Sequence, residues 1–289
     1  MLIDITQSIV NGLLLASLYA MVALGLTLIF GVLDVVNFSH GQLVTLGAYL
    51  TYALTSGGTW FWLSVLIAMV ALAVLGGAME FATFRPVRDV SINGLIVSIG
   101  WIAIFGNVFA VVWGPNQYNV DAPISGAFRI GDITISRGQL LVFLVGLCVM
   151  AVLTVMLRAS NLGKDLRATA QNREAAVLMG VAVSRVDAMA FALGAALAAL
   201  AGGLVASLFP VDPGLGSSYM VYAFIALIVG GAGSAVGAVA GSVLVGLSVS
   251  IAQTFGSTAT ANVAPFVVLI LVLMIRPQGL INTTHEASL

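Results

Sequence analysis

Charged residues are scarce in this chain of 289 residues: they make up 7% of it, against about a quarter of an average soluble protein. So few charges cannot cover the surface of a water-soluble globule of this size, which excludes a cytosolic enzyme. Disorder is excluded as well, because 61% of the residues are hydrophobic and the mean hydropathy is +1.14.

Other absences narrow the class further. The single cysteine, Cys148, lies inside an apolar run, so an intrachain disulfide is impossible. A formal net charge of −1 gives no basic surface for nucleic acid. No basic residue precedes Arg85, so we expect no typical cleavable signal peptide at the N-terminus.

What the sequence has instead is long apolar runs. A transmembrane helix needs about 20 predominantly apolar residues, and the stretches without Asp, Glu, Lys or Arg predict an all-α polytopic membrane protein with eight or nine transmembrane helices, a single domain over 1–289. The predicted helices are 5–30, 38–56, 60–81, 93–113, 138–158, 186–208, 218–231, 235–255 and 261–275. Segment 218–231 is short and precedes a Gly-Gly-Ala-Gly-Ser break, so it is either a ninth crossing or a re-entrant helix.

The distribution of basic residues predicts the orientation. With nine crossings, one side receives eight basic residues and the other only Arg129 and Arg137, which places the N-terminus outside and the tail 276–289 in the cytoplasm. Loop 114–137 is then extracytoplasmic, and its residues 128–135 alternate around a Gly-Asp turn as in a β-hairpin. The eight are Arg85, Arg88, Arg158, Lys164, Arg167, Arg173, Arg185 and Arg276.

Small residues repeat every three or four positions in 194–203 and 233–246. Such stripes let helix backbones approach closely. Packing within the helical bundle is the first interpretation, and lining of a narrow pathway is the second.

The chain offers no energy source of its own. It has no P-loop, because Asp165 follows the only lysine, Lys164, where Ser or Thr is required. Candidates for an ion relay are limited to Asp34, His40 and Glu80, and Glu80 is expected near Arg85 and Arg88 as an anchor at the membrane interface. We find no metal-ligand spacing and no hydrolase triad, so the chain is not predicted to be an enzyme, and it is predicted to bind no cofactor or metal.

One polar cluster interrupts the apolar pattern between the first two helices. The first long helix is followed by Asn37, Ser39, His40 and Gly41. Burying polar groups there without hydrogen-bond partners costs roughly several kcal/mol for each group. Either Asn37 or Ser39 caps the second helix, or the cluster contributes to the substrate route or its inner gate.

Segment 159–185 is more charged and longer than a turn requires. We predict two short helices in it: the first over 164–171, the second capped by Asn172, with Glu174 in its first turn and Gly180 at its end. The composition favours a cytoplasmic docking element over a bare solvated loop.

The Glu174-Ala175-Ala176 sequence followed by Gly180 is similar to the cytoplasmic coupling loop of bacterial ABC-importer permeases. Around it the chain resembles LivH-type permeases of branched-chain amino-acid importers, nearly end to end and in the same order. The matching stretches begin with Asn11-Gly12, continue with Ser17–Ala20, Gly25–Gly31 and Asn37–Gly41, and end with Arg85–Arg88, Ala201–Gly203, Gly230–Ser234 and Arg276–Leu280. The Ile-x-Leu-Pro ending of maltose-type permeases is missing after Gly180, which favours a ribose-type architecture.

The resemblance implies one half of the translocation pathway in the inner membrane of a bacterium. The implied partners are a LivM-like second permease, two ABC ATPase subunits that carry ATP and Mg²⁺, and a periplasmic substrate-binding protein. The implied ATPase-coupling residues are Gly163, Lys164, Arg167, Asn172, Glu174, Ala175, Ala176 and Gly180, and the loop 163–180 would transmit ATPase closure to the flanking helices.

Three alternatives remain open. Urea or short-chain-amide permeases and sugar permeases share overlapping motifs. An ion-coupled amino-acid carrier would require Asp34 or His40 and no ATPase. A channel or purely structural subunit would have no ATP dependence and no docking loop.

Overall fold

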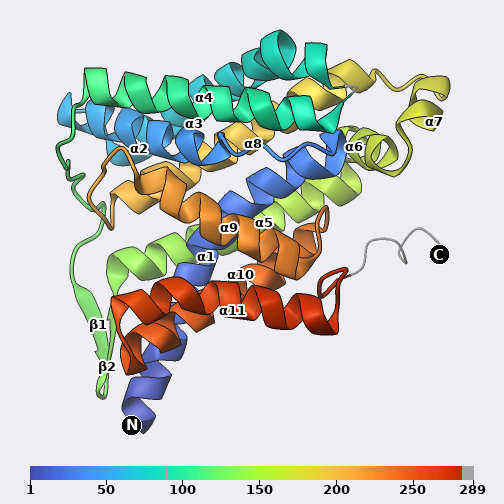
Figure 1. The fold of residues 1–289 in the computed structure, drawn as a ribbon. Coiled ribbons are helices and arrows are strands. Elements are labelled where there is room, and N and C mark those ends of the chain that lie inside the picture. Colours follow the sequence, from blue (N-terminus) through green and yellow to red (C-terminus); the bar gives the residue numbers. More distant parts are fainter. Residues whose placement is uncertain (89, 282–289) are drawn as a thin grey trace.

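The computed structural model describes residues 1–88 and 90–281, and almost all of its regular structure is helical (Figure 1). This confirms the predicted all-α class. The helices are α1 (Leu2–Leu33), α2 (His40–Ser56), α3 (Phe61–Met79), α4 (Ser91–Val112), α5 (Arg137–Ala159), α6 (Asn161–Gln171), α7 (Arg173–Leu178), α8 (Val183–Ala206), α9 (Leu215–Gly230), α10 (Ala235–Phe255) and α11 (Thr258–Ile275), with strands β1 (Ala127–Ile130) and β2 (Ile133–Ser136).

Each of the nine predicted long helices is present. Among the described residues, seven helices are long and apolar enough to cross a membrane, while α2 and α9 have only 17 and 16 residues. At 1.5 Å per residue α9 is about 24 Å long, which is shorter than the hydrocarbon core of about 30 Å. Helix α9 alone is therefore too short to span the hydrocarbon core, and neighbouring segments must complete the crossing.

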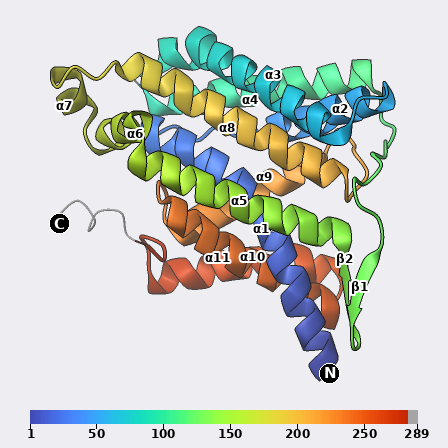
Figure 2. The ribbon, with the colours of Figure 1, turned by 180° about the vertical axis from the view of Figure 1, so that it is seen from behind.

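Helices α1 and α8 form the centre of the bundle. In their most apolar windows 83% and 72% of the residues are buried, against 11% in α11. Figures 1 and 2 show α1 running obliquely through the molecule, with α8 near its middle and α4 and α11 at its edges. The outer helices expose Ile, Val and Leu side chains, as expected of surfaces that face lipid or another membrane subunit.

The small residues of α8 serve packing. Gly194, Gly202 and Gly203 are buried, together with four of the five alanines between them. A Cβ atom on Gly202 would overlap the carbonyl oxygen of Val44, so α2 can lie against α8 only because this position is glycine. The packing interpretation of the stripe is therefore the one that the structure supports.

One end of the bundle carries the predicted hairpin. Strands β1 and β2 pair antiparallel around Gly131 and Asp132. The hairpin is tied to α1 by two hydrogen bonds: Gln7 Nε2 donates to Thr134 O, and Thr134 N donates to Gln7 Oε1, both at 2.9 Å. A bridge between Tyr118 and Val211 joins the loop after α4 to the loop after α8 at the same end.

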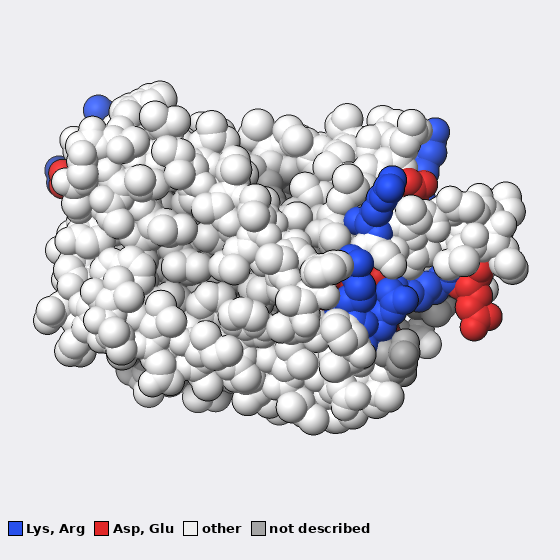
Figure 3. All heavy atoms as spheres, turned by 90° about the horizontal axis from the view of Figure 1, so that it is seen from above, with Lys and Arg blue, Asp and Glu red and all other residues white. Residues whose placement is uncertain are grey.

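The opposite end carries α6 and α7 and most of the charge. Figure 3 shows Lys, Arg, Asp and Glu side chains gathered there and only a few at the hairpin end. We call this end the basic end. Its ion-paired residues come from the segment after α3, from α7 and from the start of α8, and α6 adds Lys164, Asp165 and Arg167.

Candidate functional site

Helix α6 begins three residues earlier than predicted, because Ser160 caps it. The Ser160 hydroxyl accepts a hydrogen bond from Gly163 N at 2.9 Å. Gly163 is buried against the carbonyl groups at the end of α5, where a side chain would not fit. Leu166 and Thr169 face inward, which leaves Lys164 and Arg167 exposed.

Helix α7 follows the prediction closely. The Asn172 side chain accepts a hydrogen bond from Ala175 N at 2.9 Å, Glu174 lies in the first turn, and Ala176 is buried. Gly180 has φ +86° just beyond the helix, a left-handed conformation that favours glycine. These contacts fold the loop into a preformed helical hairpin.

The tip of α7 exposes apolar side chains outside the spans. Val177, Leu178 and Met179 are 56%, 87% and 85% exposed. They project from the charged end of the molecule, where water rather than lipid is the expected surrounding. A cluster of exposed apolar residues in such a position is typical of a protein-binding surface. We call these three residues the α7 tip.

Three arginines attach the surrounding helices to the start of α8. Glu80 and Arg85 form the ion pair expected at the interface, at 3.1 and 2.7 Å. They lie five residues apart, and the π-helical turn Glu80–Phe84 brings them to the same side of the chain. Arg85 Nη2 also donates to Ser184 O at 3.0 Å. Arg88, in contrast, pairs with Asp187 at 3.3 Å.

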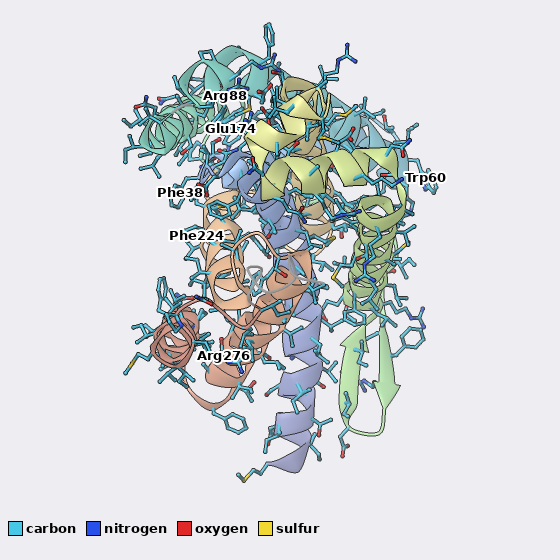
Figure 4. The ribbon with its side chains drawn as sticks, turned by 90° about the vertical axis from the view of Figure 1, so that its right-hand side faces the viewer. Phe38, Trp60, Arg88, Glu174, Phe224 and Arg276 are labelled. Atoms are coloured by element: carbon cyan, nitrogen blue, oxygen red, sulfur yellow. The ribbon has the colours of Figure 1, made fainter. Side chains whose placement is uncertain are left out.

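Asp187 also accepts a hydrogen bond from a second arginine, Arg173, at the start of α7. Its Oδ2 atom accepts hydrogen bonds from Arg173 Nη2 and from Arg88 Nη1. The Asp187 side chain is completely buried, whereas both arginines are about one-third exposed. Arg173 Nη1 also reaches the carbonyl oxygen of Val32 at 3.5 Å, in the last turn of α1. Figure 4 looks onto this end and labels Arg88 and Glu174 near the loop.

Helix α1 ends in a break that carries the polar cluster. We call residues 34–39 the first break. Asp34 has φ 52° and ends α1, and α2 begins at His40. Ser39 is the N-cap residue of α2, one of the two residues predicted to cap it, but its side chain makes no cap hydrogen bond. Asn37 Oδ1 instead accepts Ser39 N at 3.1 Å and Ser39 Oγ at 2.6 Å. The competing interaction is a local turn, which Asn favours outside helices.

The side chains of this cluster are packed inside the subunit. Asn37, Ser39 and His40 are completely buried, and Gly41 lies against the backbone of Gly216 on α9. Gln42 Nε2 donates to Ser217 Oγ at 3.2 Å, which links α2 to the start of α9. Four buried polar atoms of this cluster have no hydrogen-bond partner among the described residues: Asn37 Nδ2, the two ring nitrogens of His40, and Gln42 Oε1.

An apolar cluster lies beside the first break. The rings of Phe38 and Phe224 lie 5.3 Å apart between their centroids (Figure 4). Both rings are partly exposed and pack on the buried side chains of Leu26, Met220 and Leu227. The side chains of Asn37 and Ser39 thus point inward, while Asp34 is exposed and Phe38 lies at the surface with α9.

A second break follows α9. Residues 231–234, the second break, connect α9 to α10, and Gly231 and Gly233 have φ 108° and 87°. The chain after α11 turns back onto it: Leu280 N donates to Val229 O at 2.9 Å, and Ile281 N donates to Gly230 O at 3.0 Å. Gly31, in α1, lies close to Gly233, so the two breaks are neighbours.

Sequence reasoning missed Asp187 and Ser160. Asp187 lies one residue inside a predicted transmembrane helix and its partners are 14 and 99 positions away. A signal existed, because an acidic residue at the start of a long apolar helix needs a cationic partner. Ser160 directly precedes a helix-compatible run and is a typical N-cap residue.

Comparison with known proteins identifies the family. The family model described as "Branched-chain amino acid transport system / permease component" matches residues 8–274. The chain belongs to this permease family. The match includes every one of the nine long helices in whole or in most part, and the segment with α6 and α7 between α5 and α8.

Relatives within and near this permease family agree with the assignment. The LivH high-affinity branched-chain amino acid transport permease of Escherichia coli is 31% identical over 96% of this chain and 95% of its own length. The ribose import permease RbsC of Bacillus subtilis is 28% identical over 68% of this chain and 69% of its own, in agreement with a ribose-type architecture. The structure of PsaBC from Streptococcus pneumoniae in complex with Fab shares the fold, with a TM-score of 0.52, 13% identity and coverage of 93% and 91%.

Proposed function

We propose that this chain is a membrane subunit of an ATP-driven importer of branched-chain amino acids. The family and the name of the LivH relative support this substrate class. In this proposal ATP and Mg²⁺ are bound by two separate ATPase subunits, and a substrate-binding protein delivers the amino acid to the opposite side. A second permease of the same type completes the pathway.

The observation that carries the proposal is the α7 tip. An ATPase subunit can bury Leu178 and Met179 from water, while Glu174, Lys164 and Arg167 beside them supply the polar rim of an interface. Burial of a large apolar side chain contributes about 1.5–3 kcal/mol. The residues implied by the resemblance thus serve in two ways. Gly163, Asn172, Ala176 and Gly180 shape the loop, and the exposed residues Lys164, Arg167, Glu174 and Ala175 are available to the partner.

The same reasoning leads to the orientation that we propose for the chain in the membrane. The ATPase is cytoplasmic, so the basic end lies in the cytoplasm of a cell whose plasma membrane the chain spans. The hairpin end, with 114–137 and the N-terminus, then lies outside. The excess of arginine at the basic end agrees with the positive-inside rule.

The first break is our candidate for the inner gate. Phe38 and Phe224 close an apolar route, and buried Asn37, Ser39, His40 and Gly41 hold the break in which Phe38 lies. An apolar route suits the side chain of leucine, isoleucine or valine. Selectivity is then supplied mainly by the substrate-binding protein.

The docking proposal is tested with the double substitution Leu178→Ser and Met179→Ser. We expect the ATPase to co-purify with the subunit at least about tenfold less well, because two apolar contacts are lost. The matched control is Gln171→Ser, an exposed position on α6 outside the tip, which should leave co-purification unchanged. Equal recovery of the ATPase with the double variant would contradict the proposal.

The substrate is tested on the binding protein that co-purifies with the complex. Leucine, isoleucine and valine should each raise its thermal unfolding midpoint, and urea and ribose should not. Stabilisation by urea or ribose alone would assign the chain to another importer class. Uptake that persists without the ATPase and follows an ion gradient would favour a carrier instead.

A further inference from the structure

We propose that Asp187 and Arg173 form a relay that transmits motion of the α7 tip to the inner end of α1. This inference rests on the proposed function, since it requires that an ATPase moves the tip. Asp187 and Arg173 are positioning residues, and neither touches the substrate. The relay joins three elements at one buried carboxylate: α7 through Arg173, the extension of α3 through Arg88, and α8, which carries Asp187.

Arg173 is the attachment of α7 to the bundle. Within the described part of the chain, it makes the only side-chain hydrogen bonds that leave α7 for another part of the molecule. The remaining polar contacts of α7 and its cap, such as the hydrogen bond from Ala175 N to Asn172 Oδ1, lie within this short segment. A displacement imposed on Leu178 or Met179 therefore reaches the bundle by three routes: this guanidinium, the packing of the buried Ala176, and the short connection from α7 to α8, in which Val181 packs on Leu166 and Val186. Of these, only the guanidinium makes a side-chain hydrogen bond to α1.

The guanidinium has two arms that reach different helices. One arm binds Asp187 at the start of α8, and the other reaches Val32 O in the last turn of α1. Carbonyl groups in the last turn of a helix have no partner within it, and a cation is favourable there. Val32 lies two residues before Asp34, where the first break begins. The same side chain thus connects the ATPase-facing loop to the break that carries Phe38.

The buried carboxylate is what keeps the two arms aligned. An ionised side chain with no exposure needs charged partners, and Asp187 has two. Arg88 binds the same carboxylate oxygen as Arg173, from a segment that Arg85 independently attaches to Ser184. Asp187 is therefore a fixed point against which Arg173 can move α1. Helix α8, which packs in the centre of the bundle, transmits the opposing force to the rest of the subunit.

The experiment uses the complete complex of both permeases, the ATPases and the binding protein in proteoliposomes, with radiolabelled leucine as the probe. Three quantities are measured: co-purification of the ATPase, the rate of ATP hydrolysis, and leucine taken up per ATP hydrolysed. The variants are Asp187→Asn, Arg173→Gln, Arg173→Lys and the double variant. The matched control is Arg185→Gln, because Arg185 is exposed and makes none of these contacts although it lies two residues from Asp187.

Asp187→Asn and Arg173→Gln should leave ATPase co-purification near wild type and lower leucine uptake per ATP by about tenfold, within the usual range of coupling between sites. The double variant should be no worse than either single variant, because both remove the same link. Arg173→Lys keeps the charge near Asp187 but cannot hold both arms, so it should fall between wild type and Arg173→Gln. Arg185→Gln should behave as wild type.

The relay is wrong if Arg173→Gln keeps the wild-type ratio of uptake to hydrolysis. It is also wrong if the effects of the two substitutions add. Misfolding is recognised separately, because a misfolded variant loses ATPase co-purification, and Arg173→Gln, at a partly exposed position, then decides the question without Asp187→Asn. If the wild-type subunit itself recovers no ATPase, the proposed function fails rather than the relay.

Discussion

The two helix breaks of this chain are neighbours, yet they are built by opposite means. In the first break, a side chain supplies the hydrogen bonds: Asn37 Oδ1 accepts both Ser39 N and Ser39 Oγ. In the second break, glycine conformations and the returning backbone of 280–281 supply them. The first break thus depends on the Asn37 side chain, whereas the second depends mainly on the main chain, with Ser234 Oγ accepting Gly237 N at 3.0 Å where α10 begins.

The difference indicates which break rearranges. Backbone groups at membrane depth must be satisfied by the protein, and the second break achieves this with two strong backbone bonds. The first break leaves Asn37 Nδ2 unpartnered and Asp34 in a left-handed conformation, so less is lost when it changes. We expect the first break to move during transport and the second to stay as it is.

The substitution that should disrupt the second break most is Gly231→Ala. The positive φ of 108° and the overlap of the new Cβ with Ile281 O should together lower the free energy of unfolding by about 3 kcal/mol. Unfolding of the purified subunit by titration with SDS measures this. Gly106→Ala is the control: no atom lies within 4 Å of its Cβ position in α4, so stability should stay equal or rise. Equal stability of both variants would contradict a main-chain-held break.

A smaller effect is expected from Leu280→Pro, which removes the N–H group that donates to Val229 O. Compared with Leu280→Ala, which loses the same packing but keeps the donor, it should be less stable by about 1–2 kcal/mol. The same SDS titration compares the two variants. If they unfold together, the returning segment does not hold α9.

At the first break, Asn37→Ala should cost about 1–2 kcal/mol of stability, since buried Ser39 N and Oγ lose their acceptor. Ser39→Ala should cost less, because its backbone N–H keeps the bond to Asn37. We expect leucine uptake by the Asn37→Ala complex to fall more than its stability predicts. Loss of stability with unchanged uptake per folded complex would mean that this break is only structural.

The smallest effect concerns the contact between the two regions. A double-mutant cycle with Phe38→Ala and Phe224→Ala should give a coupling free energy of about 1 kcal/mol from the ring pair. This coupling free energy is obtained from the unfolding midpoints of the wild type, the two single variants and the double variant. Additive effects would show that the first break and α9 move independently, and the gate would then need another closing contact.

Most of the fold could be predicted because long apolar runs determine where helices lie. The hairpin around Gly131 and the cap of α7 at Asn172 were also predicted, because each depends on a few residues that are close together in the sequence. The pairing of Asp187 with Arg88 was not predictable, because 99 residues separate them in sequence. The N-cap position of Ser39 agrees with the prediction, but the partner of its hydroxyl was not predicted, because Asn37 offers a competing acceptor two positions away.

The α7 tip also bears on the fate of a subunit that has no partner. Leu178 and Met179 are among the most exposed apolar side chains of the described chain, and they lie at its charged end. Exposed apolar segments of this kind are what chaperones and proteases bind in unassembled proteins. We therefore expect the half-life of this subunit in the cell to depend on how much ATPase is synthesised with it.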